Sequence, residues 1–273
     1  MEHRFLTVDD GITLHYIAAG SGPNTIIFVH GWCSNANHFS SQLTHFSRIS
    51  RVIAIDRRGH GGSEVPSSGY DASRHSQDLL AILEHENVQS AVIVGHAGGC
   101  PSVLTFATQQ PPFCRALVLL DTRISAQVDL EGSGKQSPLA QMITSIDDDE
   151  VFARIYRGFV SNRNPELQNT VVRDAMAVPR SVAQQDLASI AIDTVVLAHA
   201  VQCPVLWLTA DEPDKVVLSS TFADIRFQQC TESGHFVQLE AAEEVNKSIE
   251  EFLVEIGLQL TTDSEIREPG NPR

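Results

Sequence analysis

Short apolar segments alternate along this chain with longer amphipathic ones. Four of the short segments are nearly continuous aliphatic runs, such as RVIAID at 51–56 and ALVLLD at 116–121. Such runs are typical of strands in a parallel sheet that is covered on both faces. The predicted strands are residues 5–8, 12–19, 25–30, 51–56, 91–96, 116–121 and 204–210.

The longer segments carry apolar residues at helical spacing. Leu79, Leu80 and Leu83 share one face of such a segment, as do Ile249 and Phe252 near the end of the chain. The predicted helices are residues 37–48, 72–86, 100–110 and 241–260. Because strands and helices alternate, the sequence predicts an α/β fold with a mostly parallel, doubly wound sheet.

The alternation stops after the sixth predicted strand, between Thr122 and about Ala200. Helical patterns recur there at 151–159, 167–176 and 186–192, after a loop-like stretch at 131–138. We expect a helical cap over the carboxyl edge of the sheet, where open α/β sheets bind ligands. The alternative is a helical subdomain with no part in binding. The expected division is a core at 1–122 and 201–260, a cap at 123–200 and a flexible tail at 261–273.

Composition narrows the possible partners and locations. The 273 residues include 42% hydrophobic residues and carry a formal charge of -15. A negative chain repels phosphate backbones and anionic headgroups, so we expect neither nucleic-acid nor membrane binding. The start, MEHRFLTVDD, lacks the plan of a signal peptide, and the longest apolar runs are too short for a membrane span. We therefore expect a soluble cytoplasmic protein, with its oligomeric state left open.

The cysteines are odd in number and scattered, without a C-x-x-C pair. This argues against a disulfide framework and against a structural zinc, so we expect no metal and buried free thiols. The five are Cys33, Cys100, Cys114, Cys203 and Cys230.

The most informative string is Gly95-His96-Ala97-Gly98-Gly99, where a predicted strand ends and a predicted helix begins. A G-x-S-x-G string in this setting forms a nucleophile elbow, in which glycines permit a sharp turn and the central side chain stands above the sheet. Here the central residue is Ala97, so the setting is intact but the hydroxyl is missing.

Other segments fall where the same arrangement needs them. Trp32 follows the third predicted strand in His30-Gly31-Trp32, and its backbone N–H can join that of Gly98 as an oxyanion hole. A glycine-rich turn, DRRGHGGS, follows the next strand at 56–63. His235 lies in ESGHF, just before the last predicted helix. Nucleophile, acid and histidine then follow in the expected chain order.

These segments together resemble the α/β-hydrolase superfamily, over nearly the whole chain from about Phe5 to Leu258. Within the superfamily, GWC at 31–33, RGHG at 58–61 and EVPSSGY at 64–70 are also similar to the cofactor-independent dioxygenases that cleave 3-hydroxy-4-quinolones. The chain departs from those enzymes at Ser34 and Gly98, where they carry histidines. Neither resemblance implies a cofactor.

His235 is the candidate general base and general acid. Three residues compete to be its acid partner: Asp121 at the end of the sixth strand, and Asp214 and Asp211 after the seventh. The resemblance to the dioxygenases favours Asp121, whereas the superfamily more often places its acid after the next strand.

Two other residues near the predicted elbow have expected roles. His96 is expected to pack the turn and, with Trp32, to border the substrate pocket. Cys100 lies one helical turn beyond Ala97 and is expected to be a buried thiol, not a nucleophile.

Ala97 leaves three hypotheses open. The favoured one is a serine-type hydrolase of ester or lactone bonds in a small apolar or aromatic molecule, which lacks its nucleophile because alanine replaces serine. The second is a natural alanine in a cofactor-free dioxygenase, in which a His–Asp dyad does proton chemistry alone. The third is a non-catalytic receptor for a small molecule on the same scaffold. A methyl group cannot attack a carbonyl, so the chain as written is expected to be hydrolytically inactive.

Overall fold

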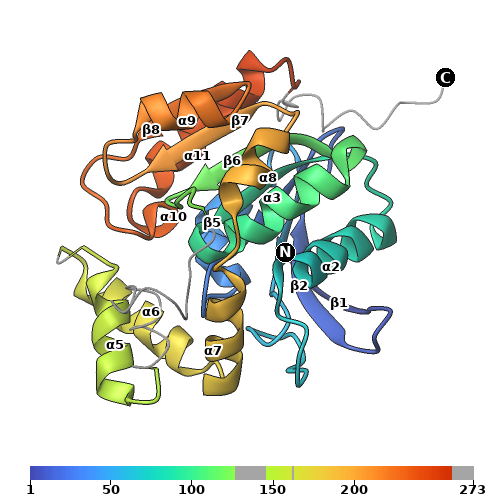
Figure 1. Ribbon diagram of the computed structural model, residues 1–273. Helices are drawn as coiled ribbons and strands as arrows, with labels where there is room; N and C mark the ends of the chain where they lie inside the picture. The colour runs from blue at the N-terminus through green and yellow to red at the C-terminus, as the bar shows by residue number, and fades with distance from the viewer. Residues whose placement is uncertain (127–145, 162, 260–273) are drawn as a thin grey trace.

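The computed structural model describes residues 1–126, 146–161 and 163–259 (Figure 1). Its strands are β1 (Glu2–Thr7), β2 (Thr13–Ala19), β3 (Thr25–Val29), β4 (Arg51–Ile55), β5 (Ala91–His96), β6 (Cys114–Leu120), β7 (Val205–Thr209) and β8 (Ile225–Gln229). They form one sheet in the order β1-β2-β4-β3-β5-β6-β7-β8. β2 pairs antiparallel with β1 and β4, and all the other neighbours run parallel. The predicted mostly parallel α/β fold is confirmed.

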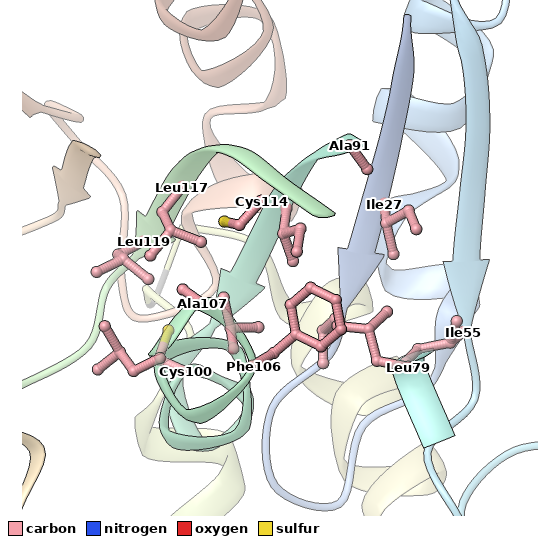
Figure 2. Close-up of a cluster of buried hydrophobic side chains, with 14 of the residues drawn as sticks. Ile27, Ile55, Leu79, Ala91, Cys100, Phe106, Ala107, Cys114, Leu117 and Leu119 are labelled. Carbon is pink, nitrogen blue, oxygen red and sulfur yellow. The ribbon is translucent and has the colours of Figure 1, made fainter. Parts of the chain in front are cut away.

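Helices cover both faces of this sheet. On one face lie α1 (Ser40–Phe46) and α11 (Ala242–Glu255), and on the other α2 (Ala72–His85), α3 (Cys100–Gln109), α8 (Thr194–Ala200) and α9 (Lys215–Thr221). Successive residues of β3 alternate between the two: Ile26 and Phe28 pack under α1 and α11, whereas Ile27 and Val29 belong to the other cluster (Figure 2). Burial on both faces explains why the central strands are continuous apolar runs.

The insertion between β6 and β7 is helical, as predicted. It contains α5 (Asp149–Gly158), α6 (Pro165–Met176), α7 (Arg180–Ser189) and then α8. Residues of α5, α6 and α7 form a third apolar cluster with Trp32, Tyr70 and Phe236 from loops at the carboxyl ends of strands. Ala198 of α8 belongs instead to the core cluster that lines α3. Helices α5 to α7 therefore lie beyond the carboxyl edge, and α8 returns along the sheet.

Several predicted boundaries change. The predicted helix at 37–48 is a short 3-10 turn, Ala36–Phe39, followed by α1. The last predicted helix, 241–260, is α11, which ends at Glu255, and the short helix α10 (Val237–Glu240) precedes it. The remaining short turns are Ala97–Gly99 and Pro111–Phe113. Strand β8 was not predicted, because its sequence IRFQQ is half-buried at the sheet edge and lacks an apolar run. The predicted loop at 131–138 and tail at 261–273 lie outside the described residues.

Within the described ranges, no helix combines the length and apolar character that a membrane crossing needs.

Candidate active site

The turn between β5 and α3 has the geometry of a nucleophile elbow. Ala97 follows the strand directly and has a φ of +46°, in the left-handed region that side chains rarely adopt. A Cβ on Gly99 would lie 2.4 Å from the carbonyl oxygen of His30, so only glycine lets α3 begin this close to the neighbouring loop. The methyl group of Ala97 therefore occupies the position from which an elbow presents its nucleophile.

Asp121 and His235, a predicted acid and the predicted base, are hydrogen-bonded to each other. The Nδ1–H of His235 donates to Oδ2 of Asp121 at 2.6 Å. The other carboxylate oxygen, Oδ1, accepts from the backbone N–H of Ala210 and from the hydroxyl of Thr209, both at 2.9 Å. Because Nδ1 carries the proton toward Asp121, Nε2 is the nitrogen left for proton transfer.

The surroundings of Asp121 keep its carboxylate ionised. Burial works to raise the pKa of Asp121, but the hydrogen bond and charge of His235, with the donors at Ala210 and Thr209, outweigh burial and lower it. An ionised Asp121 holds the imidazole in one tautomer and stabilises its cationic form.

The other candidate acids have different positions. Asp214 is the N-cap of α9, where its Oδ1 accepts from the backbone N–H of Val217 at 3.1 Å. Asp211 is exposed on the loop before that helix. Of the three carboxylates that the sequence left open, the structure brings Asp121 to His235.

His235 is also held by the insertion. Its backbone N–H donates to the carbonyl oxygen of Phe159 at 2.8 Å, and the two rings lie 5.0 Å apart. A Cβ on Gly234 would lie 2.7 Å from that same oxygen, which explains the glycine before the histidine. The side chain of His235 is 29% exposed, so the residue that follows α5 orders the loop without covering its imidazole.

His96 is buried and holds the backbone of His235 in place. It is 1% exposed, and its Nε2–H donates to the carbonyl oxygen of His235 at 2.9 Å. Burial, together with the charge of His235, lowers the pKa of His96 to about 3, so its ring is neutral. The predicted packing role fits this position. The expectation that His96 borders the substrate pocket stays a prediction; its ring packs against those of His235 and Phe236.

The two predicted oxyanion donors are neighbours. A Cβ on Gly98 would lie 3.1 Å from the backbone nitrogen of Trp32, and one on Gly31 would lie 3.2 Å from Cβ of Ala97. The carbonyl oxygen of Trp32 accepts from the hydroxyl of Tyr156 in α5 at 2.6 Å. That bond ties the peptide group between Trp32 and Cys33 to α5. The backbone amides of residues 32 and 98 thus lie beside the elbow methyl group.

Helix α7 and the residue after it pack against Trp32 and Gly98. The indole Nε1–H of Trp32 donates to the carbonyl oxygen of Ala183 at 2.9 Å. A Cβ on Gly98 would meet Cδ1 of Ile190 at 2.7 Å. Asp186 lies between these two contact positions in sequence. Positions 183, 186 and 190 follow helical spacing, so a single face of this segment approaches the site.

Asp186 joins α7 to the turn after β4. Arg57 donates to its two carboxylate oxygens at 2.6 and 3.0 Å, and both side chains are buried. His75 Nε2 lies 3.2 Å from Oδ1, and His60 Nε2 lies 3.7 Å from Oδ2. Burial works to raise the pKa of Asp186, and the charge of Arg57 with the hydrogen bond of His75 lowers it well below the ordinary value. No sequence pattern predicted this pair, because its partners lie 129 positions apart.

Cys100 is a buried thiol, as predicted. It is 1% exposed at the start of α3, and burial raises its pKa to about 12. A thiol in this state is a poor nucleophile at neutral pH.

Comparisons with known proteins identify the family of this chain. A family model described as the α/β hydrolase fold matches residues 24–171. The chain is 36% identical over 115 residues to 2-(acetamidomethylene)succinate hydrolase of Mesorhizobium japonicum, covering 42% of this chain and 41% of that protein. It is 33% identical over 119 residues to a bifunctional esterase/perhydrolase of Acinetobacter calcoaceticus, covering 42% and 43%. The matches thus span about two fifths of the length of these relatives.

Solved structures match over more of the chain. An N-acyl homoserine lactone degrading enzyme superposes with a TM-score of 0.79 at 23% identity, covering 92% of this chain and 100% of that one. At this identity the likeness is one of fold.

Proposed function

This chain belongs to the α/β-hydrolase fold family, and on that premise we propose that its site is built to cleave an ester or lactone bond. The substrate we propose is a small apolar or aromatic molecule, bound between the elbow and helices α5 to α7. The single observation that carries the proposal is the 2.6 Å contact between His235 Nδ1 and Asp121, beside an elbow in the left-handed conformation. With Ala97 at the elbow, the sequence as it stands lacks the attacking oxygen.

The proposed chemistry is acyl transfer in two steps. A serine hydroxyl at the elbow would attack the carbonyl carbon, and Nε2 of His235 would take its proton. Asp121 would stabilise the imidazolium, and the amides of Trp32 and Gly98 would bind the oxyanion. His235 would then protonate the leaving oxygen, and water would release the acid by the same route.

The test restores the nucleophile. We expect Ala97→Ser to raise hydrolysis of p-nitrophenyl esters or lactones by at least about a thousandfold, because loss of a triad nucleophile typically costs about a millionfold in turnover. In that background, His235→Ala should abolish turnover and leave substrate affinity within about tenfold, since the imidazole acts in proton transfer.

Initial rates and substrate titrations measure both effects. An Ala97→Ser protein that hydrolyses no faster than the unaltered one would contradict acyl transfer. If it bound a substrate analogue tightly without turnover, the receptor hypothesis would gain support instead.

One observation favours a second candidate. The base and its acid partner are complete although the elbow carries only a methyl group, and the acid directly follows the sixth strand. A dyad of this kind suits deprotonation of a 3-hydroxy-4-quinolone-like ring, which then reacts with oxygen directly. The unaltered chain would then consume oxygen and release carbon monoxide under air and do neither under nitrogen. Oxygen-electrode and gas measurements on the unaltered chain separate this reaction from acid release without oxygen.

A further inference from the structure

Two of the cysteines lie together at the end of the sheet opposite the active site. The sulfur atoms of Cys114 and Cys203 are 3.5 Å apart, although the residues are 89 positions apart in sequence. Cys114 begins β6, whose other end leads to Asp121, and Cys203 lies two residues before β7. We propose that this pair is a modification site, at which a small disulfide such as oxidised glutathione converts the two thiols into an intramolecular disulfide.

The backbone positions suit such a bond. β6 and β7 are parallel neighbours whose ladder begins at the pair Leu117 and Val205, and Cys114 and Cys203 lie three and two residues before that pair. The backbone around them thus brings the two sulfur atoms to 3.5 Å.

The side chains also point the same way. Cys114 is a member of the apolar cluster that faces α2 and α3 (Figure 2), and Cys203 packs against that cluster. Both sulfur atoms therefore lie on one side of the sheet. A disulfide requires these atoms to close from 3.5 Å to the bonding distance of about 2.05 Å.

Accessibility and thiol chemistry assign the order of events. Cys203 is partly exposed, whereas Cys114 is 6% exposed. The hydrogen bond between the two sulfur atoms lowers the pKa of Cys203 and raises that of Cys114. Cys203 is thus the attacking thiolate and Cys114 the resolving thiol. The other three cysteines are buried, and burial raises the pKa of each of them.

The reaction balances in two exchange steps. The Cys203 thiolate attacks one sulfur of oxidised glutathione, which forms a mixed disulfide and releases one glutathione thiolate. The Cys114 thiol then loses its proton and attacks the Cys203 sulfur, which forms the protein disulfide and releases the second glutathione. The protein loses two electrons and two protons, and oxidised glutathione is reduced to two glutathione molecules.

The test is intact-mass spectrometry and peptide mapping after incubation with oxidised glutathione. We expect a loss of two hydrogen masses from the unaltered chain and a peptide pair joined through Cys114 and Cys203. Cys114→Ala should instead keep one glutathione on Cys203, and Cys203→Ser should stay unmodified. The matched control, Cys230→Ser, should form the same disulfide as the unaltered chain.

The outcomes on the unaltered chain decide the proposal without any variant. No mass change, a stable glutathione adduct, or a bond to another cysteine would each overturn it. Circular dichroism checks that the variants fold, and Cys114→Ala keeps an apolar side chain within the apolar cluster.

Discussion

Backbone strain at single residues gathers around the proposed site. Among the described residues, the non-glycine positions with positive φ are Cys33, Asn87, Ala97, Asp121 and Glu232. All but Asn87 lie in loops that follow β3, β5, β6 or β8 at the carboxyl edge. Left-handed backbone costs such residues about 1–2 kcal/mol each, and it persists where the surroundings enforce it, often at functional sites. This clustering supports the proposed site independently of the side-chain contacts.

Asp121 and Asp214 provide a direct test at the residue scale. In an Ala97→Ser background, we expect Asp121→Asn to lower kcat at least about a hundredfold, because the amide no longer stabilises the imidazolium. Asp214→Asn should cost less than about tenfold, because Asp214 caps α9 and does not contact His235. Steady-state rates on one ester compare them. The opposite order would assign the acid to the loop after β7.

At the scale of elements, α7 ties the insertion to the core. Its contacts reach Trp32 through Ala183 and Arg57 through Asp186. A buried ion pair is costly to break from one side, because the remaining charge keeps its desolvation penalty. The position of α7 beside Trp32 therefore depends on a charge pair as well as on apolar packing.

We expect Asp186→Asn to lower the free energy of unfolding by about 3–5 kcal/mol, since it leaves Arg57 buried without a counter-charge. Urea unfolding followed by tryptophan fluorescence measures the loss, and Trp32 also reports locally on α7. The matched control is Asp149→Asn, which breaks an ion pair with Arg180 in which Asp149 is 72% exposed. It should cost less than about 1 kcal/mol. Equal effects of the two substitutions would argue against the anchoring role.

Strand β8 shows why an edge strand is hard to predict from apolar patterns. Its residues are only half-buried and include Arg226 and two glutamines, because it is the last strand at one edge of the sheet. Without burial on both faces, no apolar run is needed. The central strands, such as β3 and β5, were predictable for the opposite reason.

For the whole molecule, buried histidines set a dependence of stability on pH. Burial lowers the pKa of His30 and His75, that of His60 to about 4 and that of His96 to about 3. Below the unfolded value of about 6.5, the unfolded chain binds protons that the folded chain refuses. Stability is therefore lost as the pH falls from about 6.5 toward these lowered values.

We expect the free energy of unfolding to fall by about 2 kcal/mol for each of His60 and His96 between pH 7 and pH 5. Urea titrations at the two pH values measure the difference. His60→Gln should reduce this difference. A stability that is equal at both pH values would show that these rings protonate without cost in the folded state.

Local sequence determined the elements and the catalytic residue types. Apolar runs predicted seven of the eight strands, the central ones because both of their faces are buried, and the glycines around Ala97 predicted the sharp turn before α3. His235 was predicted from its place in the chain order of the family.

Only the tertiary structure decided which side chains meet. The choice of Asp121 over Asp214 and Asp211 depended on where β6 and the His235 loop end in space, a separation of 114 positions along the chain. The pairing of Asp186 with Arg57 and the contact between Cys114 and Cys203 likewise join distant segments. Local patterns record whether a residue is buried, but the strand order and the path of the insertion determine its partner, and neither is written in any local stretch of sequence.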